Sequence, residues 1–204
     1  MLVISSKNKR EIKAESLQAA ARVMQRCDAL ALASLNPDYI ERTYLSKAHA
    51  QANKIVEGWI SEAQMESWQD SVGNVWGRYT CKETNAPVLI IGSHLDSVVN
   101  AGKYDGILGV LLGIELGNFL ARHQIDLPFH LDVVGFCDEE GVRFGATLLG
   151  SQALAGKWQP EWTELTDERG VSLAEAMIEF GLDPLKAMDA KRSGIDSRVF
   201  RSAH

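Results

Sequence analysis

The sequence predicts an α/β fold, and this expectation depends on three stretches in the middle of the 204-residue chain. The run from Pro87 to Ile91 is short, apolar and rich in β-branched residues, which is typical of a buried strand. The run from Phe129 to Cys137 has the same character. Between them, the apolar segment from Ile107 to Leu120 is expected to form a helix beside the sheet. We therefore expect two parallel strands with a helix between them.

Two helices are predicted before the sheet. The segment from Glu11 to Ser34 is rich in alanine and leucine, with apolar residues at helical spacing, until Asn36-Pro37-Asp38 interrupts it. A second helix is expected to begin after Ser46, a candidate N-cap, and to run to about Ala63.

A β-hairpin is predicted next, ahead of the first central strand. Its strands are expected around Met65–Gln69 and Asn74–Cys81, with Val72-Gly73 in the turn between them. This hairpin would form an edge of the sheet.

Glycines recur every four residues in the central helix, at Gly109, Gly113 and Gly117. Because glycine lowers helix stability, such a stripe predicts a face where the helix lies close against the sheet. A helix dimer within a membrane is excluded, since the apolar run is interrupted by Glu115 and is too short to span a bilayer.

The last third of the chain predicts shorter elements. A short helix is expected over Ala146–Ala155, followed by a loop from Pro160 to Gly170. Ser172 is a candidate cap for a helix over Leu173–Phe180. From Lys186 to His204 the charges are scattered and no periodicity is sustained, so we expect an irregular tail.

Composition narrows the classes of partner. The formal net charge is −6, which argues against a nucleic acid or an anionic membrane surface as the partner. The chain begins with a very short apolar run followed by basic residues, the reverse of a secretory signal. These features predict a protein that acts on neither membranes nor nucleic acids.

The cysteines indicate a reducing compartment. Cys27, Cys81 and Cys137 are far apart and lack CxxC spacing, so no disulfide framework is expected and a cytoplasmic location is favoured. Cys137 stands beside an acidic cluster and could be a nucleophile. No histidine is adjacent in the motif, however, and a small buried strand residue is the preferred interpretation.

A histidine and two aspartates follow the first central strand. His94-x-Asp96 comes where the strand ends, and Asp105 stands eleven residues after His94, next to Gly106. Open α/β sheets bind their ligands at such strand ends, and an imidazole with carboxylates suits zinc or manganese. A lone His-x-Asp could equally cap or pair at the strand end.

The second central strand runs into Asp138-Glu139-Glu140-Gly141. Adjacent acids raise one another's pKa unless a cation lies between them. An isolated acidic triplet would usually be a solvated turn. Because two neighbouring strands both deliver ligand-type side chains at their ends, a metal site is the better explanation.

Three motifs in this order resemble the di-metal amidohydrolase and exopeptidase family. They are His94-x-Asp96, Gly102-x-x-Asp105-Gly106 and Glu139-Glu140-Gly141-x-Arg143-Phe144. Within that family, the chain resembles the branch of allantoate amidohydrolases and N-carbamoyl-L-amino-acid hydrolases at Ser71–Arg78, Gly92–Val98, Glu140–Phe144 and Leu149–Ser151. The resemblance covers roughly Tyr44 to Leu182. It implies the N-terminal part of a zinc-exopeptidase-like catalytic domain, with a mixed sheet flanked by helices.

The resemblance also implies a role for each site residue. His94 would bind one divalent metal ion, Asp105 would bridge two, and Glu140 would bind the second; the ions would be zinc or manganese. Glu139 would be the general base, close to the metals without being a ligand. Asp96 would accept the other imidazole N–H and fix the tautomer of the His94 ring.

The substrate implied by this branch is a small ureido compound. Its members cut a ureido C–N bond and release ammonia and carbon dioxide. Allantoate is favoured by the stretches Glu139–Gly145 and Leu148–Gly156, with an N-carbamoyl-L-amino acid as the alternative.

The resemblance further predicts how the chain is divided. Residues 1–43 would be an N-terminal helical segment, 44–185 a partial di-metal catalytic domain, and 186–204 an irregular tail where the family's dimer-forming domain would follow. Full-length relatives are expected to be homodimers. The chain would then be a truncated protein or a gene fragment, with two protein ligands for each metal instead of the usual three. A weakly active hydrolase and a non-catalytic remnant are both compatible with this interpretation.

Overall fold

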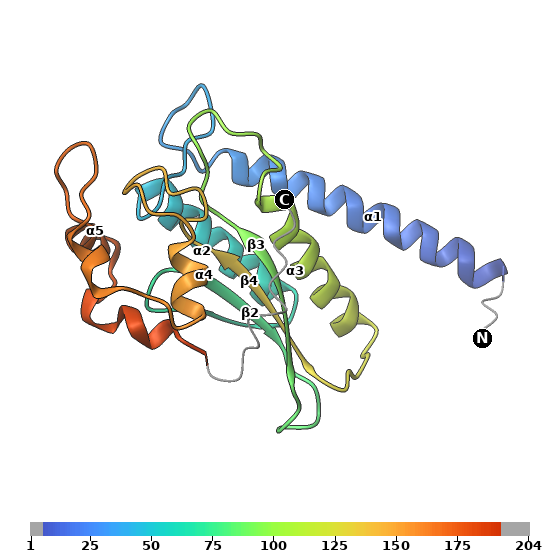
Figure 1. The fold of residues 1–204 in the computed structure, drawn as a ribbon. Coiled ribbons are helices and arrows are strands. Elements are labelled where there is room, and N and C mark those ends of the chain that lie inside the picture. Colours follow the sequence, from blue (N-terminus) through green and yellow to red (C-terminus); the bar gives the residue numbers. More distant parts are fainter. Residues whose placement is uncertain (1–5, 193–204) are drawn as a thin grey trace.

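The computed structural model describes residues 6–192 and confirms the α/β prediction. Its centre is a four-stranded sheet in the order β1-β2-β4-β3, flanked by helices on both faces (Figure 1). The strands are β1 (Glu66–Gln69), β2 (Val75–Tyr79), β3 (Val88–His94) and β4 (His130–Phe136). The helices are α1 (Ser6–Ala31), α2 (Lys47–Glu62), α3 (Ile107–Arg122), α4 (Leu149–Leu154) and α5 (Leu173–Phe180), with 3₁₀ helices η1 (Pro160–Glu164) and η2 (Pro184–Ala190).

The sheet is mixed because its two halves are connected differently. β1 and β2 form the predicted antiparallel hairpin, and β2 also pairs antiparallel with β4. β3 and β4 pair parallel, in register from Val88 with His130 to His94 with Phe136. The parallel pairing requires a crossover, which α3 provides. As a result, the carboxyl ends of β3 and β4 lie side by side at the same end of the sheet.

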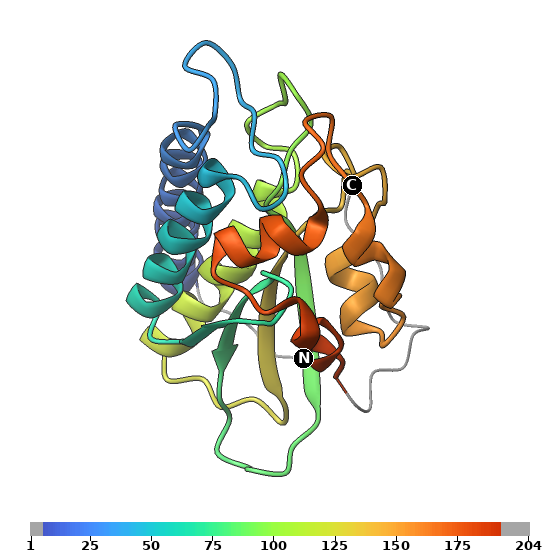
Figure 2. The same cartoon turned by 90° about the vertical axis from the view of Figure 1, so that its left-hand side faces the viewer.

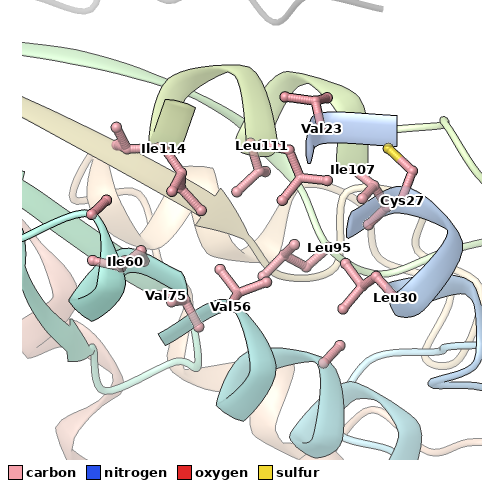
Figure 3. Close-up of a cluster of buried hydrophobic side chains, with 14 of the residues drawn as sticks. Val23, Cys27, Leu30, Val56, Ile60, Val75, Leu95, Ile107, Leu111 and Ile114 are labelled. Atoms are coloured by element: carbon pink, nitrogen blue, oxygen red, sulfur yellow. The ribbon is translucent and has the colours of Figure 1, made fainter. Parts of the chain in front are cut away.

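One core lies between the sheet and the helices α1, α2 and α3 (Figure 3). The predicted glycine stripe explains how closely α3 approaches the strands. A Cβ at Gly113 would lie 2.7 Å from a methyl group of Val133, and one at Gly109 would lie 2.6 Å from Cβ of Ser93. Both distances are too short for real contacts, so only glycine allows this packing. Buried residues of α1 such as Cys27 and Leu30 belong to the same core.

The opposite face of the sheet is covered by α4 (Figure 2). Leu154 of α4 packs on Trp76 and Val134 of the sheet. On the same face the fully buried carboxylate of Asp132 pairs with Arg78 of β2, at 2.7 Å, and with Arg192, at 2.6 Å. This network attaches the end of the described chain to the sheet.

Two local expectations need correction. The first helix begins at Ser6 and ends at Ala31, earlier at both ends than the predicted Glu11–Ser34. The strand predicted to be buried is buried only near His94, since Val88 and Leu89 are 42% and 41% exposed. The cause is the strand order: β3 is the last strand of the sheet, so one of its sides has no neighbouring strand within residues 6–192.

The segment predicted as an irregular tail starts within a short helix. η2 covers Pro184–Ala190 and buries Ala187 and Ala190, while residues 193–204 of the predicted tail lie outside the described residues. Across residues 6–192, we find no helix with the length and apolar content needed to cross a bilayer.

The exposed edge of β3 generates a prediction about self-association. Unpaired apolar edge strands add to other sheets, and a lysine on the edge opposes this addition. Val88→Lys should therefore slow concentration-dependent aggregation, as measured by light scattering. Ile178→Lys is the matched control, because Ile178 is also exposed and apolar but lies on helix α5. Equal slowing by both variants would show that exposed apolar area matters and the strand edge does not.

Candidate metal centre

The ring of His94 is held rigidly at the end of β3. It is 4% exposed, and Nδ1 lies 3.1 Å from the main-chain carbonyl oxygen of Asp96. Since a carbonyl can only accept, this hydrogen bond requires the proton on Nδ1 and leaves the lone pair on Nε2. Nε2 faces the carboxylate of Asp105, at 3.7 Å from Oδ1. The ring therefore presents a potential metal-binding nitrogen toward an acidic side chain.

Gly106 sets how the ring is placed against the start of α3. Its φ is +69°, a backbone conformation that L side chains rarely adopt. A Cβ at this position would lie 2.6 Å from three atoms of the His94 ring. The glycine next to Asp105 thus allows the backbone to lie directly against the imidazole.

The acidic residues arrive from the end of β4, beside the histidine. Among the described residues, one group of potential ligands is close enough to hold a metal ion: His94, Glu139 and Glu140, with one atom from each within 4.8 Å of one another. Both glutamates are half-buried. Asp105 stands beside this group through its contact with His94, and its side chain is 56% exposed. The fold thus gathers all four residues predicted as metal ligands or general base.

Asp96 connects the two strand ends in a way that the sequence did not indicate. Its carboxylate accepts the main-chain N–H of Glu139 at 3.0 Å and that of Glu140 at 3.1 Å. The predicted contact with the His94 ring is made by the Asp96 main-chain carbonyl, while the carboxylate lies 3.8 Å from Nδ1. Asp96 therefore orients the imidazole through its backbone and the glutamates through its side chain.

Burial makes negative charge costly at Asp96, Asp138 and Glu140. It raises the pKa of Asp96, and it raises the pKa of Glu140 together with the neighbouring charges of Glu139, Asp105 and Asp96. The pKa of Asp138 rises to about 8 because the side chain is buried and lies near Asp96 and Glu139. Neither carboxylate oxygen of Asp138 has a hydrogen-bond partner in the structure. A divalent cation would offset this accumulated charge, and an imidazole with carboxylates is a fitting donor set for zinc or manganese.

Other contacts around the centre could not be read from the sequence. Arg143 holds the loop after the glutamates, donating to Asp167 at 3.1 Å and to the main-chain carbonyl of Tyr44 at 3.0 Å. The sequence marked Arg143 only as part of a motif. Cys137 is fully buried, and burial raises the pKa of its thiol, so the structure supports the interpretation of Cys137 as a packing residue.

Known proteins are related to this chain in sequence. The profile of Peptidase family M28 matches residues 74–198. Allantoate deiminase of Arabidopsis thaliana is 41% identical over 150 residues, which cover 71% of this chain and 28% of the relative. N-carbamoyl-L-amino acid amidohydrolase of Geobacillus stearothermophilus is 38% identical over 165 residues, covering 81% of this chain and 40% of the relative. The chain thus spans less than half the length of these curated relatives.

Solved structures show the same relationship. A hydantoinase/carbamoylase family amidase from Burkholderia ambifaria superposes with a TM-score of 0.74 at 29% identity, covering 79% of this chain and 40% of that chain. AtUAH in complex with glyoxylate superposes with a TM-score of 0.77 at 30% identity, and the superposition covers 85% of this chain and 43% of that chain. The predicted resemblance to the allantoate and carbamoyl branch is confirmed.

The contact between Gly106 and His94 generates a prediction. Gly106→Ala should displace the imidazole and lower the affinity for Mn²⁺ by about tenfold or more, the usual effect of disturbing what orients a ligand. Gly102→Ala is the matched control, since a Cβ there would meet no atom within 4 Å. Isothermal titration calorimetry measures both affinities. Equal affinities in the two variants would show that this close contact is not needed to place the ring.

Proposed function

The chain belongs to peptidase family M28, and we propose that it carries metal-binding and proton-transfer residues for hydrolysis of a ureido C–N bond. The observation that carries this proposal is the convergence of His94, Glu139 and Glu140 at the adjacent ends of β3 and β4. The similar proteins named allantoate deiminase and N-carbamoyl-L-amino acid amidohydrolase support the choice of bond.

We assign the side chains as follows. His94 and Glu140 would each hold one of two divalent ions, zinc or manganese, and Asp105 would be shared between the two ions. When bound, such ions polarise the scissile carbonyl and lower the pKa of a coordinated water. Glu139 stays free of the metals, takes the proton from the attacking water and passes it to the leaving nitrogen. Asp96 aligns both glutamates through its bonds to their main-chain amides.

We propose allantoate as the substrate of the whole protein. The Arabidopsis allantoate deiminase, at 41% identity, supports this choice. An N-carbamoyl-L-amino acid is the second candidate, because the Geobacillus relative aligns over a larger share of this chain, 81% against 71%. Release of ammonia from the two compounds in parallel assays discriminates between them.

We also propose that the protein works in the cytoplasm. Cys27, Cys81 and Cys137 are all free thiols and all buried, and none is paired with another. This supports the expectation of a reducing compartment, where thiols persist.

The metal assignment predicts binding by the 204-residue chain itself. Titration with Mn²⁺ or Zn²⁺ in a calorimeter should give a binding heat that is lost in the double variant His94→Ala/Asp105→Ala. The control is His123→Ala/Asp126→Ala, which removes the same two residue types from exposed positions near the end of α3. Equal heats from the chain and its His94→Ala/Asp105→Ala variant would contradict the assignment.

The separate roles of the two glutamates predict opposite outcomes of the same substitution. Turnover is measured in a chimera in which residues 74–192 replace the matching segment of the Geobacillus relative. Glu139→Gln should keep the metal while turnover falls by at least ~10²-fold, the lower end for losing a general base. Glu140→Gln should lower metal occupancy, as measured by atomic emission. An emptied centre in Glu139→Gln with a full centre in Glu140→Gln would reverse the two roles.

A further inference from the structure

Arg42 stands out because the fold buries its charge. Among the lysines and arginines whose side chains the structure describes, it is the one classed as buried, at 1% exposed. Its guanidinium donates to three main-chain carbonyls: Leu95 at 2.6 Å, Ala33 at 2.8 Å and Leu30 at 3.1 Å. Among the side chains of residues 13–192, which the structure describes, no carboxylate lies at ion-pair distance from the guanidinium of Arg42. Burying a cation in this way is costly, so the arrangement calls for a reason.

Part of the arrangement is explained by helix capping. The carbonyls of Leu30 and Ala33 lie at or just beyond the end of α1, where main-chain acceptors lack partners within the helix. A basic side chain near a helix C-terminus is favourable for this reason. Capping does not explain the third bond, which is the shortest and goes to Leu95, just beyond β3.

Arg42 also joins the segment after β3 through its own main chain. Its amide N–H donates to Oγ of Ser97 at 2.9 Å, and its carbonyl accepts the Ser97 N–H at 3.0 Å. Together with the bond to Leu95, these contacts hold the residues on both sides of Asp96. The neighbouring bridge between Ile40 and Ala101 continues the attachment.

The residue held between these contacts is the one that organises the centre. The Asp96 carboxylate accepts the amides of Glu139 and Glu140, and its carbonyl lies at hydrogen-bond distance from Nδ1 of His94. A shift of the Leu95–Ser97 backbone would therefore move both glutamates and the imidazole. Arg42 is also the buried positive charge that interacts with Asp96; burial lowers its pKa to about 10, so it remains charged at neutral pH.

We propose that Arg42 is a positioning residue for the metal centre: its forked guanidinium and its main chain fix the Leu95–Ser97 segment, so that Asp96 keeps His94, Glu139 and Glu140 aligned. This inference rests on the proposed metal centre. The shape of the guanidinium is essential to this role, because only a forked group reaches the end of α1 and the Leu95 carbonyl together.

Arg42→Lys is the decisive variant, since lysine keeps the charge and loses the fork. The control is Arg78→Lys, which breaks the two bonds to Asp132, four residues before the end of β4. Mn²⁺ affinity is measured by calorimetry at a temperature where thermal melting shows each protein fully folded. Arg42→Lys should bind at least about tenfold more weakly, as for other residues that orient ligands, and Arg78→Lys should bind as the unaltered chain does.

Two further measurements separate positioning from stability alone. Amide hydrogen exchange at Glu139 and Glu140, followed by NMR without metal, should accelerate in Arg42→Lys and not in Arg78→Lys. In the background of Asp96→Asn, Arg42→Lys should cause little further loss of affinity, because both changes act on the same contacts. If Arg42→Lys fails to fold, Ser97→Ala is the milder test, because it removes the Oγ that accepts the main-chain N–H of Arg42. A smaller loss of Mn²⁺ affinity is then expected.

Several outcomes would overturn the proposal. Arg42→Lys could lower the melting temperature while Mn²⁺ affinity and amide exchange at Glu139 and Glu140 stay unchanged. That result would show that Arg42 only caps α1. Additive losses in the double variant would show that it does not act through Asp96. If the unaltered chain binds no metal, the metal centre itself fails, and the exchange rates still show whether Arg42 aligns the glutamates.

Discussion

The centre depends on the hydrogen bonds between the Asp96 carboxylate and the amides of Glu139 and Glu140. Glu139 and Glu140 follow Asp96 by 43 and 44 residues in the sequence, and the two bonds, of 3.0 and 3.1 Å, join the segments after β3 and β4. A carboxylate that accepts two main-chain donors fixes both the position and the direction of the peptide it holds. The glutamate side chains are therefore oriented by their own backbone, and the His94 ring is oriented by the same residue.

Bringing several carboxylates together at this centre costs free energy, because their negative charges repel one another and are partly buried. Burial raises the pKa of Asp96, Asp138 and Glu140, and the charge of Asp96 raises the pKa of the other two further. Two features oppose the repulsion in the protein itself: the main-chain donors on Asp96 and the buried guanidinium of Arg42. Asp138 receives neither, and its carboxylate is left without a hydrogen-bond partner in the structure. Such a site has much to gain from a divalent cation.

The sequence predicted the placement of the candidate site residues better than the contacts that support them. His94, Glu139 and Glu140 follow apolar strands, and parallel strand ends meet at one edge of a sheet, so local patterns were enough to bring them together. The exposure of β3 was missed because strand order depends on pairings that a single strand does not encode. The bonds of Arg42 were missed for a different reason: its acceptors are main-chain carbonyls, which leave no residue pattern.

The parallel pairing of β3 and β4 also has a kinetic consequence. The imidazole and the glutamates come together only after the chain has closed the whole crossover through α3, and such distant pairings form late and slowly during folding. A metal ion held by the proposed centre would bind only after that closure, and its binding free energy would add to the stability of the closed state alone. Such an ion would slow the reopening of the crossover, and it would leave the rate of closure unchanged.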